Sequence, residues 1–385
     1  MYKHNLVFAG ACMGMLLFGM VFLSLGTIAV FIQEQYQVDS IRVASLASSL
    51  PLGILLGSVI FGPIVDRFGY KPLLIISSGL ILLTFQLTAF ANSFRVLQFS
   101  YFLIGFAGGM INGGTNALSA DITADHKGAK LSLLGAFFGI GALGMPLLIG
   151  ILSRHYAYQT IISGIGLFVF LPMMYFILLK FPEAKLKQGF PLQKAFSLVK
   201  EPVLILMGFI LFFESALEGM VNNWSTIYLN SVDLPGQDAL YALSCQLAAI
   251  AFTRLFLSYF LRHMASGIVV YISLALIFAG TMLLYFTSSL AIAVTAMICL
   301  GMGFAAGFPI ILGYVGDLYT EISGTAFSLV IVLALTGNTL LNYLVGIISK
   351  SQGIGSFPII LAVCVIMMAI LFTLAIKKIS IKIKN

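Results

Sequence analysis

The segment Gly62-Pro-Ile-Val-Asp66-Arg67-Phe-Gly69-Tyr-Lys71 is a short charged stretch between two long apolar runs, 42–65 and 71–91. Each run is long enough to cross a hydrocarbon core as a helix, which takes about 20 residues. Gly62 and Gly69 permit a tight turn, and Asp66 can act on the positive N-terminal end of a neighbouring helix. The stretch therefore predicts two membrane helices joined by a charged turn.

The composition of the whole chain agrees with a membrane location. Of the 385 residues, 60% are hydrophobic and 9% are charged, and the mean hydropathy is +1.08. A soluble domain carries about 25% charged residues. The four cysteines lie in apolar runs, the four histidines lie near the ends of runs without metal-ligand spacing, and no nucleophile with a base is evident. We expect no disulfide framework, no metal site, no organic cofactor and no enzymatic activity.

Twelve apolar runs separated by charged or Gly/Pro-containing breaks predict an all-α membrane protein of twelve transmembrane helices. The first run is too long for a signal-peptide core, so it is expected to be the first helix. The expected helices cover roughly residues 5–33, 42–65, 71–91, 96–121, 128–153, 158–180, 202–230, 238–262, 266–286, 289–317, 322–349 and 355–377.

Basic residues are concentrated in alternate loops. Cytoplasmic loops retain Lys and Arg, so the side with more of them is expected to be cytoplasmic. That side carries Lys3, Arg67, Lys71, Lys127, Lys130, Lys180, Lys185, Lys187, Lys194, Lys200, Arg262, Lys377, Lys378, Lys382 and Lys384, and the other side carries Arg42, Arg95, Arg154 and Lys350. Both termini are predicted to be cytoplasmic. Topology accounts for the formal charge of +7, and no nucleic acid partner is expected.

An internal repeat divides the chain into two halves. Gly105, Asp121, Ser132, Gly150 and Ser153 recur at a constant shift of 196 as Gly301, Asp317, Ser328, Gly346 and Ser349. The longest polar stretch, 181–201, falls between the sixth and seventh helices. We predict a six-helix half over 1–180, a cytoplasmic linker over 181–201 and a second six-helix half over 202–385.

The charged turn resembles the G-x-x-x-D-R-x-G-x-[RK] signature of the major facilitator superfamily. The resemblance implies the fold of that family, with two six-helix halves that rock about a site near the membrane midplane. It also implies a conformational latch that favours the outward-facing state, formed by Gly62, Asp66, Arg67, Gly69 and Lys71. The repeat-related segment 258–268 lacks the Asp and retains Arg262-His263, so its latch should be weaker.

Two shorter segments resemble the sugar:cation symporters of that superfamily. Residues 218–229, Glu-Gly-Met-Val-Asn-Asn-Trp-Ser-Thr-Ile-Tyr-Leu, are similar to a pattern of the fucose:proton symporter and sodium-dependent glucose transporter groups. Asn112-Gly-Gly-Thr-Asn116 resembles the E-T-x-x-N segment of the fucose symporters, with Asn112 at the position of their proton-linked Glu. The first helix also lacks an acidic residue between Asn5 and Ile32. Proton coupling by the route of the fucose symporters is therefore not expected.

Three ionisable residues fall at membrane depth, where each is a functional-site hypothesis. Glu214 and Glu218 share one face of the seventh helix with Asn222. These carboxyls are candidates for ion coupling, through a cation or a proton. The alternative is a structural ion pair of either carboxyl with Arg254. For Arg254 we expect pairing within the second half, with Asp317, and a direct substrate contact is the alternative.

Neutral polar side chains form further stripes on apolar helices. A sugar needs several amide donors and acceptors and an aromatic face. Asparagines can also join helices, and a tryptophan can lie at the membrane interface. The candidate substrate-binding residues are Asn112, Asn116, Glu218, Asn222, Trp224, Gln246, Asn338 and Asn342.

These patterns favour a secondary active transporter that spans the cell (inner) membrane several times. We expect a monomer that imports a small polar solute, a monosaccharide or close derivative, by symport with Na⁺ or H⁺. The alternative is a drug or lipid exporter of the same superfamily, for which the 33 Phe and 16 Met could line an apolar cavity. Clustered amides argue against that alternative.

Overall fold

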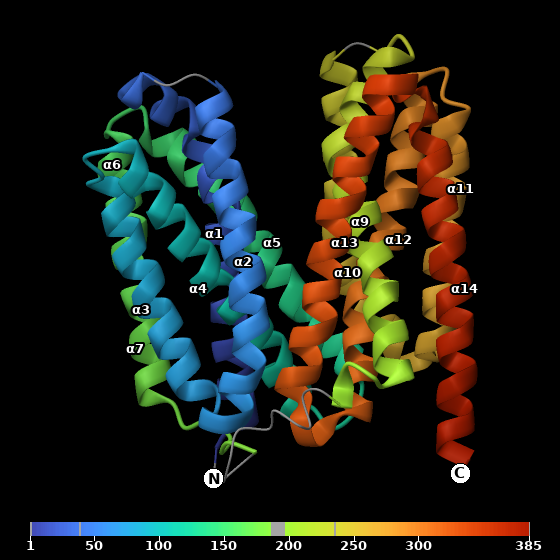
Figure 1. The fold of residues 1–385 in the computed structure, drawn as a ribbon, viewed down its shortest axis with the longest axis horizontal. Coiled ribbons are helices and arrows are strands. Elements are labelled where there is room, and N and C mark those ends of the chain that lie inside the picture. Colours follow the sequence, from blue (N-terminus) through green and yellow to red (C-terminus); the bar gives the residue numbers. More distant parts are fainter. Residues whose placement is uncertain (1, 38–39, 186–196, 235, 385) are drawn as a thin grey trace. The chain divides into compact units, whose positions relative to one another are not determined.

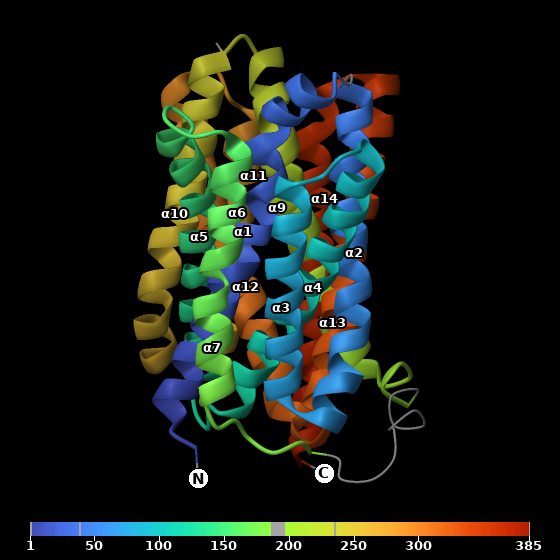
Figure 2. The same cartoon turned by 90° about the vertical axis from the view of Figure 1, so that its left-hand side faces the viewer.

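The computed structural model describes residues 2–37, 40–185, 197–234 and 236–384, and all regular secondary structure in these ranges is helical. The α-helices are labelled in Figure 1, and Figure 2 shows them after a 90° turn. The elements are α1 His4–Tyr36, α2 Ser40–Phe68, α3 Tyr70–Ala89, α4 Phe94–Asp121, α5 Lys127–Leu152, α6 Tyr158–Phe168, α7 Phe170–Leu178, α9 Pro202–Ser231, α10 Gly236–His263, α11 Ser266–Tyr285, α12 Leu290–Leu318, η1 Thr320–Ile322, α13 Ser323–Gln352, η2 Ile354–Ser356 and α14 Phe357–Lys384.

Twelve segments of the described chain are long and apolar enough to cross a membrane. Most of their bounds lie within a few residues of the predicted runs, so the prediction of a twelve-helix membrane protein is confirmed. The sixth run contains two helices, α6 and α7, that together lie against α3 (Figures 1 and 2). Pro172 lacks the N–H that would bond to the Phe168 carbonyl, and this loss explains the break at Val169.

The chain folds into two compact units. Unit 1 contains Met1–Ala124, Leu134–Gln193 and Tyr319–Ser328, and unit 2 contains Asp125–Leu133, Lys194–Leu318 and Leu329–Asn385. Each unit thus includes a short segment from the other predicted half: the start of α13 in unit 1 and the start of α5 in unit 2. The division into halves at 181–201 stays a prediction, and residues 186–196 of that linker lie outside the described residues.

In unit 1, glycines bring the backbones of α2 and α4 into direct contact. A Cβ atom would lie 2.1 Å from the Phe102 carbonyl oxygen at Gly53, and 2.2 Å from the Leu50 carbonyl oxygen at Gly105. At Gly109 it would lie 2.2 Å from the Ile54 carbonyl oxygen. No side chain fits at these positions, so α2 and α4 form a rigid pair that carries Asn112 one turn further along α4.

Unit 2 repeats this packing between α10 and α12. A Cβ atom at Gly301, the repeat counterpart of Gly105, would lie 2.4 Å from the carbonyl oxygen of Gln246. Gln246 is itself the counterpart of Leu50 at the same shift of 196. The repeat found in the sequence therefore corresponds to the same helix contact in both units.

Candidate transport site

Glu214 lies on α9 inside unit 2, with none of its surface exposed. Neither of its carboxylate oxygens has a hydrogen-bond partner among the described residues. The carboxyl group lies against α12, because a Cβ atom at Gly307 would be 2.4 Å from Oε1 and 2.5 Å from Cδ. Gly307 thus makes the space that this side chain occupies. Burying an ionised carboxylate without a hydrogen-bond donor costs free energy, so the protonation state of Glu214 needs an explanation.

Glu218 lies one turn further along α9 and is partly exposed. Its charge acts on Glu214, and the positive charge of Arg254 on α10 acts on both carboxyls. In the described part of the chain no ion-pair contact joins Arg254 to either glutamate, and its Nε is buried without a hydrogen-bond partner. The alternative of a direct structural ion pair is therefore not formed in this structure.

The expected ion pair between Arg254 and Asp317 is wrong. Asp317 pairs instead with Lys127, with 2.9 Å between Nζ and Oδ1. Asp317 lies in the last turn of α12, whereas Arg254 precedes the end of α10 by nine residues, or about 14 Å of helix. Arg254 is therefore too deep in unit 2 to reach Asp317, and the start of α5 brings Lys127 there.

Asn338, Asn342 and Trp224 form one hydrogen-bonded network between α9 and α13. Asn342 Nδ2 donates to the backbone oxygen of Asn338 at 2.8 Å and to its Oδ1 at 2.9 Å. Asn342 Oδ1 accepts from the Trp224 indole at 3.1 Å and from Asn223 Nδ2 at 3.0 Å. The Asn342 amide is therefore fully used in orienting its neighbours. The exposed Asn223, which sequence reasoning missed, belongs to the same network.

The Asn338 amide lies directly over α9. A Cβ atom at Gly219 would lie 2.5 Å from its Oδ1, and its Nδ2 is 3.5 Å from the Ser215 hydroxyl. Two other predicted residues of unit 2 have unused polar atoms: both amide atoms of the fully buried Gln246, and Oδ1 of Asn222, lack partners among the described residues. Unit 2 thus contains buried polar atoms on α9 and α10 with spare hydrogen-bonding capacity.

In unit 1, Asn112 and Asn116 form the same kind of pair on α4. Asn116 Nδ2 donates to the Asn112 backbone oxygen at 2.8 Å and to Asn112 Oδ1 at 3.0 Å. Both residues are buried. Both asparagine pairs, one turn apart on their helices, are thus hydrogen-bonded within the pair, and their role in binding a solute stays a prediction.

The predicted latch residue Asp66 caps the N-terminus of α13. Its Oδ1 accepts from the Gly324 N–H at 3.1 Å, and its Oδ2 accepts from the Thr325 N–H at 2.8 Å and from the Thr325 hydroxyl at 2.6 Å. Asp66 is fully buried. The expectation that this carboxylate acts on a neighbouring helix N-terminus is confirmed.

Glycine is needed at positions 62 and 69 of the motif for two different reasons. At Gly62 a Cβ atom would lie 2.4 Å from the Gly324 carbonyl oxygen, so close approach requires glycine. Gly69 has φ +81°, which side chains disfavour. Arg67 is exposed and its guanidinium lies 5.2 Å from the Phe68 ring centroid, and Lys71 is partly buried in the first turn of α3.

Four residues without an assigned role in the sequence extend this region. Asp121, the last residue of α4, accepts from the Tyr70 hydroxyl and from Ser323 Oγ, the latter at 2.8 Å. Lys185 lies 2.7 Å from Asp121 Oδ2 and donates to Ser323 Oγ at 2.6 Å. We call Asp66, Tyr70, Asp121, Lys185, Ser323 and Thr325 the Asp66 cluster. The repeat, which pairs Asp121 with Asp317, was the sequence signal that could have found it.

Unit 2 contains a counterpart of this cluster at the start of α5. Lys127 pairs with Asp317 and also donates to the Gly316 carbonyl at 2.8 Å. Ser132 Oγ donates to the Arg254 carbonyl at 2.9 Å, and its repeat partner Ser328 donates to the Ser58 carbonyl in unit 1. We call Lys127, Ser132, Gly316 and Asp317 the Asp317 cluster. Positions 58 and 254 are also related by the shift of 196.

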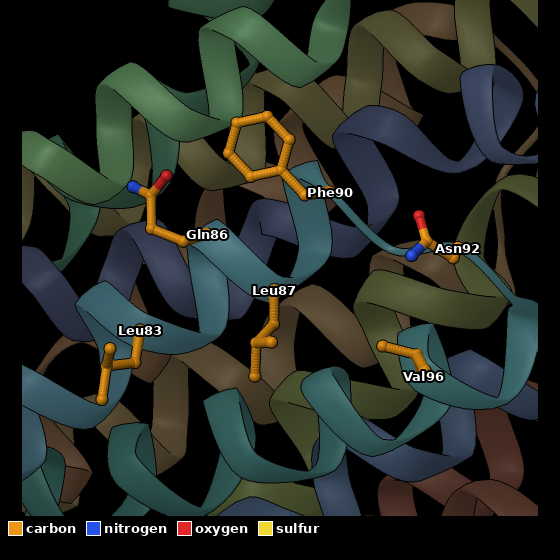
Figure 3. A pocket seen from close by; sticks show the side chains of 6 residues that line it. All are labelled: Leu83, Gln86, Leu87, Phe90, Asn92 and Val96. Atoms are coloured by element: carbon orange, nitrogen blue, oxygen red, sulfur yellow. The ribbon is translucent and has the colours of Figure 1, made fainter.

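A groove of about 450 Å³ lies on unit 1 at the end of α3 and the start of α4 (Figure 3). Gln86 is one of two polar residues that line it, and both its amide nitrogen and its amide oxygen are hydrogen-bonded to Ser163. The remaining lining is mostly aliphatic or aromatic: Leu83, Leu87, Phe90, Asn92 and Val96. The groove contains none of the candidate site residues.

Residues 10–337 match the family model described as Major Facilitator Superfamily. The chain belongs to this superfamily. As a member of that family it is a transporter, and the twelve long apolar helices among its described residues agree with a multi-pass membrane protein. The expected family resemblance is confirmed.

Among curated facilitators, the uncharacterized MFS-type transporter YfkL of Bacillus subtilis is 24% identical over 348 residues, or 87% of each chain. The multi-drug resistance efflux pump PmrA of Streptococcus pneumoniae is 26% identical over 174 residues, or 44% of each chain. Among solved structures, the outward conformation of FucP, the Escherichia coli fucose:proton symporter, superimposes on this chain with a TM-score of 0.80. The match covers 96% of this chain and 98% of FucP at 16% identity, which establishes a shared fold.

Proposed function

We propose that this facilitator imports a small polar solute, a monosaccharide or close derivative, by symport with Na⁺ or H⁺ through alternating access. The observation that carries the proposal is the polar surface of unit 2, where Trp224 and Asn338 are held in place by Asn342. Amides beside an aromatic ring suit a sugar, because its hydroxyl groups need donors and acceptors and its C–H face packs on the ring. The fold shared with a fucose symporter supports the same reading.

The roles within the proposed site differ. Asn338, Trp224, Asn222, Gln246 and Glu218 on unit 2 supply solute contacts, as do Asn112 and Asn116 on unit 1. Asn342 acts as a positioning residue, since its amide atoms are occupied. Glu214 and Glu218 couple the ion. We also place the protein in the inner membrane with both termini cytoplasmic, on the charge distribution of the loops.

A drug exporter is the second candidate, because the efflux pump PmrA is 26% identical to 44% of this chain. An exporter of lipophilic cations should prefer apolar contacts to amides. The two candidates therefore differ in which ligands stabilise the protein.

A thermal-shift screen of the purified protein separates the two candidates. We expect one or a few monosaccharides to raise the melting temperature and lipophilic cations such as tetraphenylphosphonium to leave it unchanged. The Asn338→Ala variant should lose that shift, because a buried hydroxyl left unpaired costs about 1 to 3 kcal/mol. If the lipophilic cations raise the melting temperature and no sugar does, the exporter is the correct function and the importer is wrong.

The Asp66 cluster is proposed to be the latch that favours the outward-facing state. Asp66→Asn weakens the cap on α13, so the population should shift towards the inward-facing state. Cysteines engineered near the C-terminal ends of α1 and α9 should then react more slowly with a membrane-impermeant maleimide. Unchanged labelling would remove the cluster from the conformational cycle.

A further inference from the structure

Among the described residues, the interior of unit 2 contains two acidic side chains but only one basic side chain. Two carboxyls, Glu214 and Glu218, lie on α9, and one guanidinium, Arg254, lies on α10, which packs against α9 and brings its charge within range of both carboxyls. A net charge buried in a membrane protein is costly, so a cluster of two acids and one base needs one more positive charge.

No other charge is available there from the helices that pack against α9, namely α10, α12, α13 and α14. In the described residues their charged side chains lie near the ends of the spans: Asp238, Arg262, His263, Asp317, Lys350, Lys377 and Lys378. The thiols and phenols on these helices and on α9 cannot supply a positive charge, because neither group is positively charged in any protonation state: Cys245, Cys299, Cys364, Tyr228, Tyr241, Tyr259, Tyr314 and Tyr343. The described residues of unit 2 therefore supply no further positive charge beside Glu214 and Glu218.

The two carboxyls differ in how well they can bear a negative charge. Glu218 is partly exposed, so water can solvate its carboxylate. Glu214 is fully buried, with no donor to either oxygen and with the Gly307 backbone against it. An ionised carboxylate there would lose its solvation and gain no hydrogen bond in return. The added charge is thus needed at Glu214.

We propose that the cluster binds one proton, that the proton resides on Glu214, and that H⁺ is the coupling ion of the symport. The step is Glu214–COO⁻ + H⁺ → Glu214–COOH, while Glu218 stays ionised opposite Arg254. This inference rests on the proposed symport and adds to it the ion, the residue that holds it and a count of one per cycle.

Infrared spectroscopy of the full-length protein in dodecyl maltoside tests the proton count without any solute. A protonated carboxyl has a C=O stretch distinct from those of carboxylates and amides. At pH 7 we expect the band of one carboxyl in the wild type and no band in Glu214→Gln. Arg254→Gln should give twice the wild-type amplitude, because both acids then lose their counter-charge, and Arg254→Lys should give the wild-type amplitude. A wild type without the band, or an Arg254→Gln variant with a single band, overturns the proposal.

Residue-type labelling tests the location. Glu214→Asp is produced with ¹³C-carboxyl aspartate, and the band should move to lower frequency because residue 214 holds the proton. In the matched control Glu218→Asp, labelled in the same way, the band should not move. A shift in the control alone would place the proton on residue 218.

The identity of the coupling ion is tested by recording the same infrared band in sodium chloride and in choline chloride at constant pH. We expect no effect of Na⁺ on the band, and its loss on adding Na⁺ would make Na⁺ the competing occupant and overturn the proposal. Because no solute is present, a wrong sugar assignment would leave these results unchanged. Failure of the proton proposal and failure of the sugar proposal are thus distinguishable.

Discussion

The Asp66 cluster of unit 1 and the Asp317 cluster of unit 2 occupy repeat-related positions but use different chemistry. In unit 1, a buried carboxylate accepts three hydrogen bonds from residues 324 and 325. In unit 2, position 262 is the counterpart of Asp66 and contains an exposed arginine, whose charge has the wrong sign to cap a helix N-terminus. Unit 2 relies instead on Lys127, which pairs with Asp317.

The positive charge of each cluster also has a different origin. Lys127 corresponds to Ser323 at the shift of 196, so the start of α13 lacks the lysine that the start of α5 has. In unit 1, Lys185 from the segment that follows α7 supplies it by contacting Asp121 and Ser323. The comparison teaches that the repeat conserved the positions of the contacts while the groups that make them diverged.

The largest expected effect is that of Asp66→Ala. Two N–H groups and one hydroxyl would lose a charged acceptor in a buried place, and we expect a loss of about 3 kcal/mol in the free energy of unfolding. The control Arg262→Ala, at the equivalent exposed position, should change it by less than about 0.5 kcal/mol. Denaturant titration of both purified variants measures the difference. Equal losses would mean that the two clusters are energetically equivalent.

The second-largest difference is expected between alanine substitutions of Gly324, at the start of α13, and Gly128, at the start of α5. At Gly324 a Cβ atom would lie 2.7 Å from Asp66 Oδ1 and 2.8 Å from the Gly62 carbonyl oxygen, whereas at its counterpart Gly128 the nearest atom is a side-chain carbon at 3.4 Å. We expect Gly324→Ala to lower stability by about 2 kcal/mol and Gly128→Ala to leave it within about 0.5 kcal/mol. Melting temperatures in one detergent provide the comparison. An unchanged melting temperature for Gly324→Ala would show that the contact between Asp66 and residue 324 can adjust to a Cβ atom.

Ser328→Ala and Ser132→Ala are expected to have equal effects, because at these positions the two units make the same kind of contact. Both hydroxyls donate to the carbonyl oxygen of an equivalent residue, Ser58 or Arg254. Each substitution should cost about 1 kcal/mol, and the two costs should agree. Thermal unfolding of both variants under identical conditions checks this expectation, and a cost confined to one serine would argue against repeat equivalence.

The smallest effect is expected for Asp317→Asn. The Asp317 side chain is 58% exposed, so solvent screens its pair with Lys127, and the loss should be below about 1 kcal/mol. It should shrink further as salt is raised from 50 mM to 500 mM, since exposed charges are screened. Melting curves across that range test it, and a large salt-independent loss would show that the pair is effectively buried.

The sequence predicted the features that depend on local pattern. Apolar run length predicted the twelve helices, and the charged turn predicted that Asp66 acts on the N-terminus of a neighbouring helix. Each of these depends on residues close in the chain or on a motif with one physical solution.

The features that failed depend on contacts between distant segments. Pairing Arg254 with Asp317 followed from opposite charge alone, but helix depth separates them and Lys127 is the partner. Nothing local indicates that Lys185 reaches Asp121, or that the Asn342 amide is consumed by Trp224 and Asn223. Such contacts require the tertiary structure.

Trp224 is the only tryptophan in the chain, and its indole N–H is bonded to an amide oxygen of the proposed binding surface. Intrinsic fluorescence excited at the indole band therefore reports a single site. Indole emission depends on hydrogen bonding and on nearby water, so any solute that rearranges the Asn342 network should change its wavelength or intensity. The protein thus contains its own optical probe, and binding can be followed without a label.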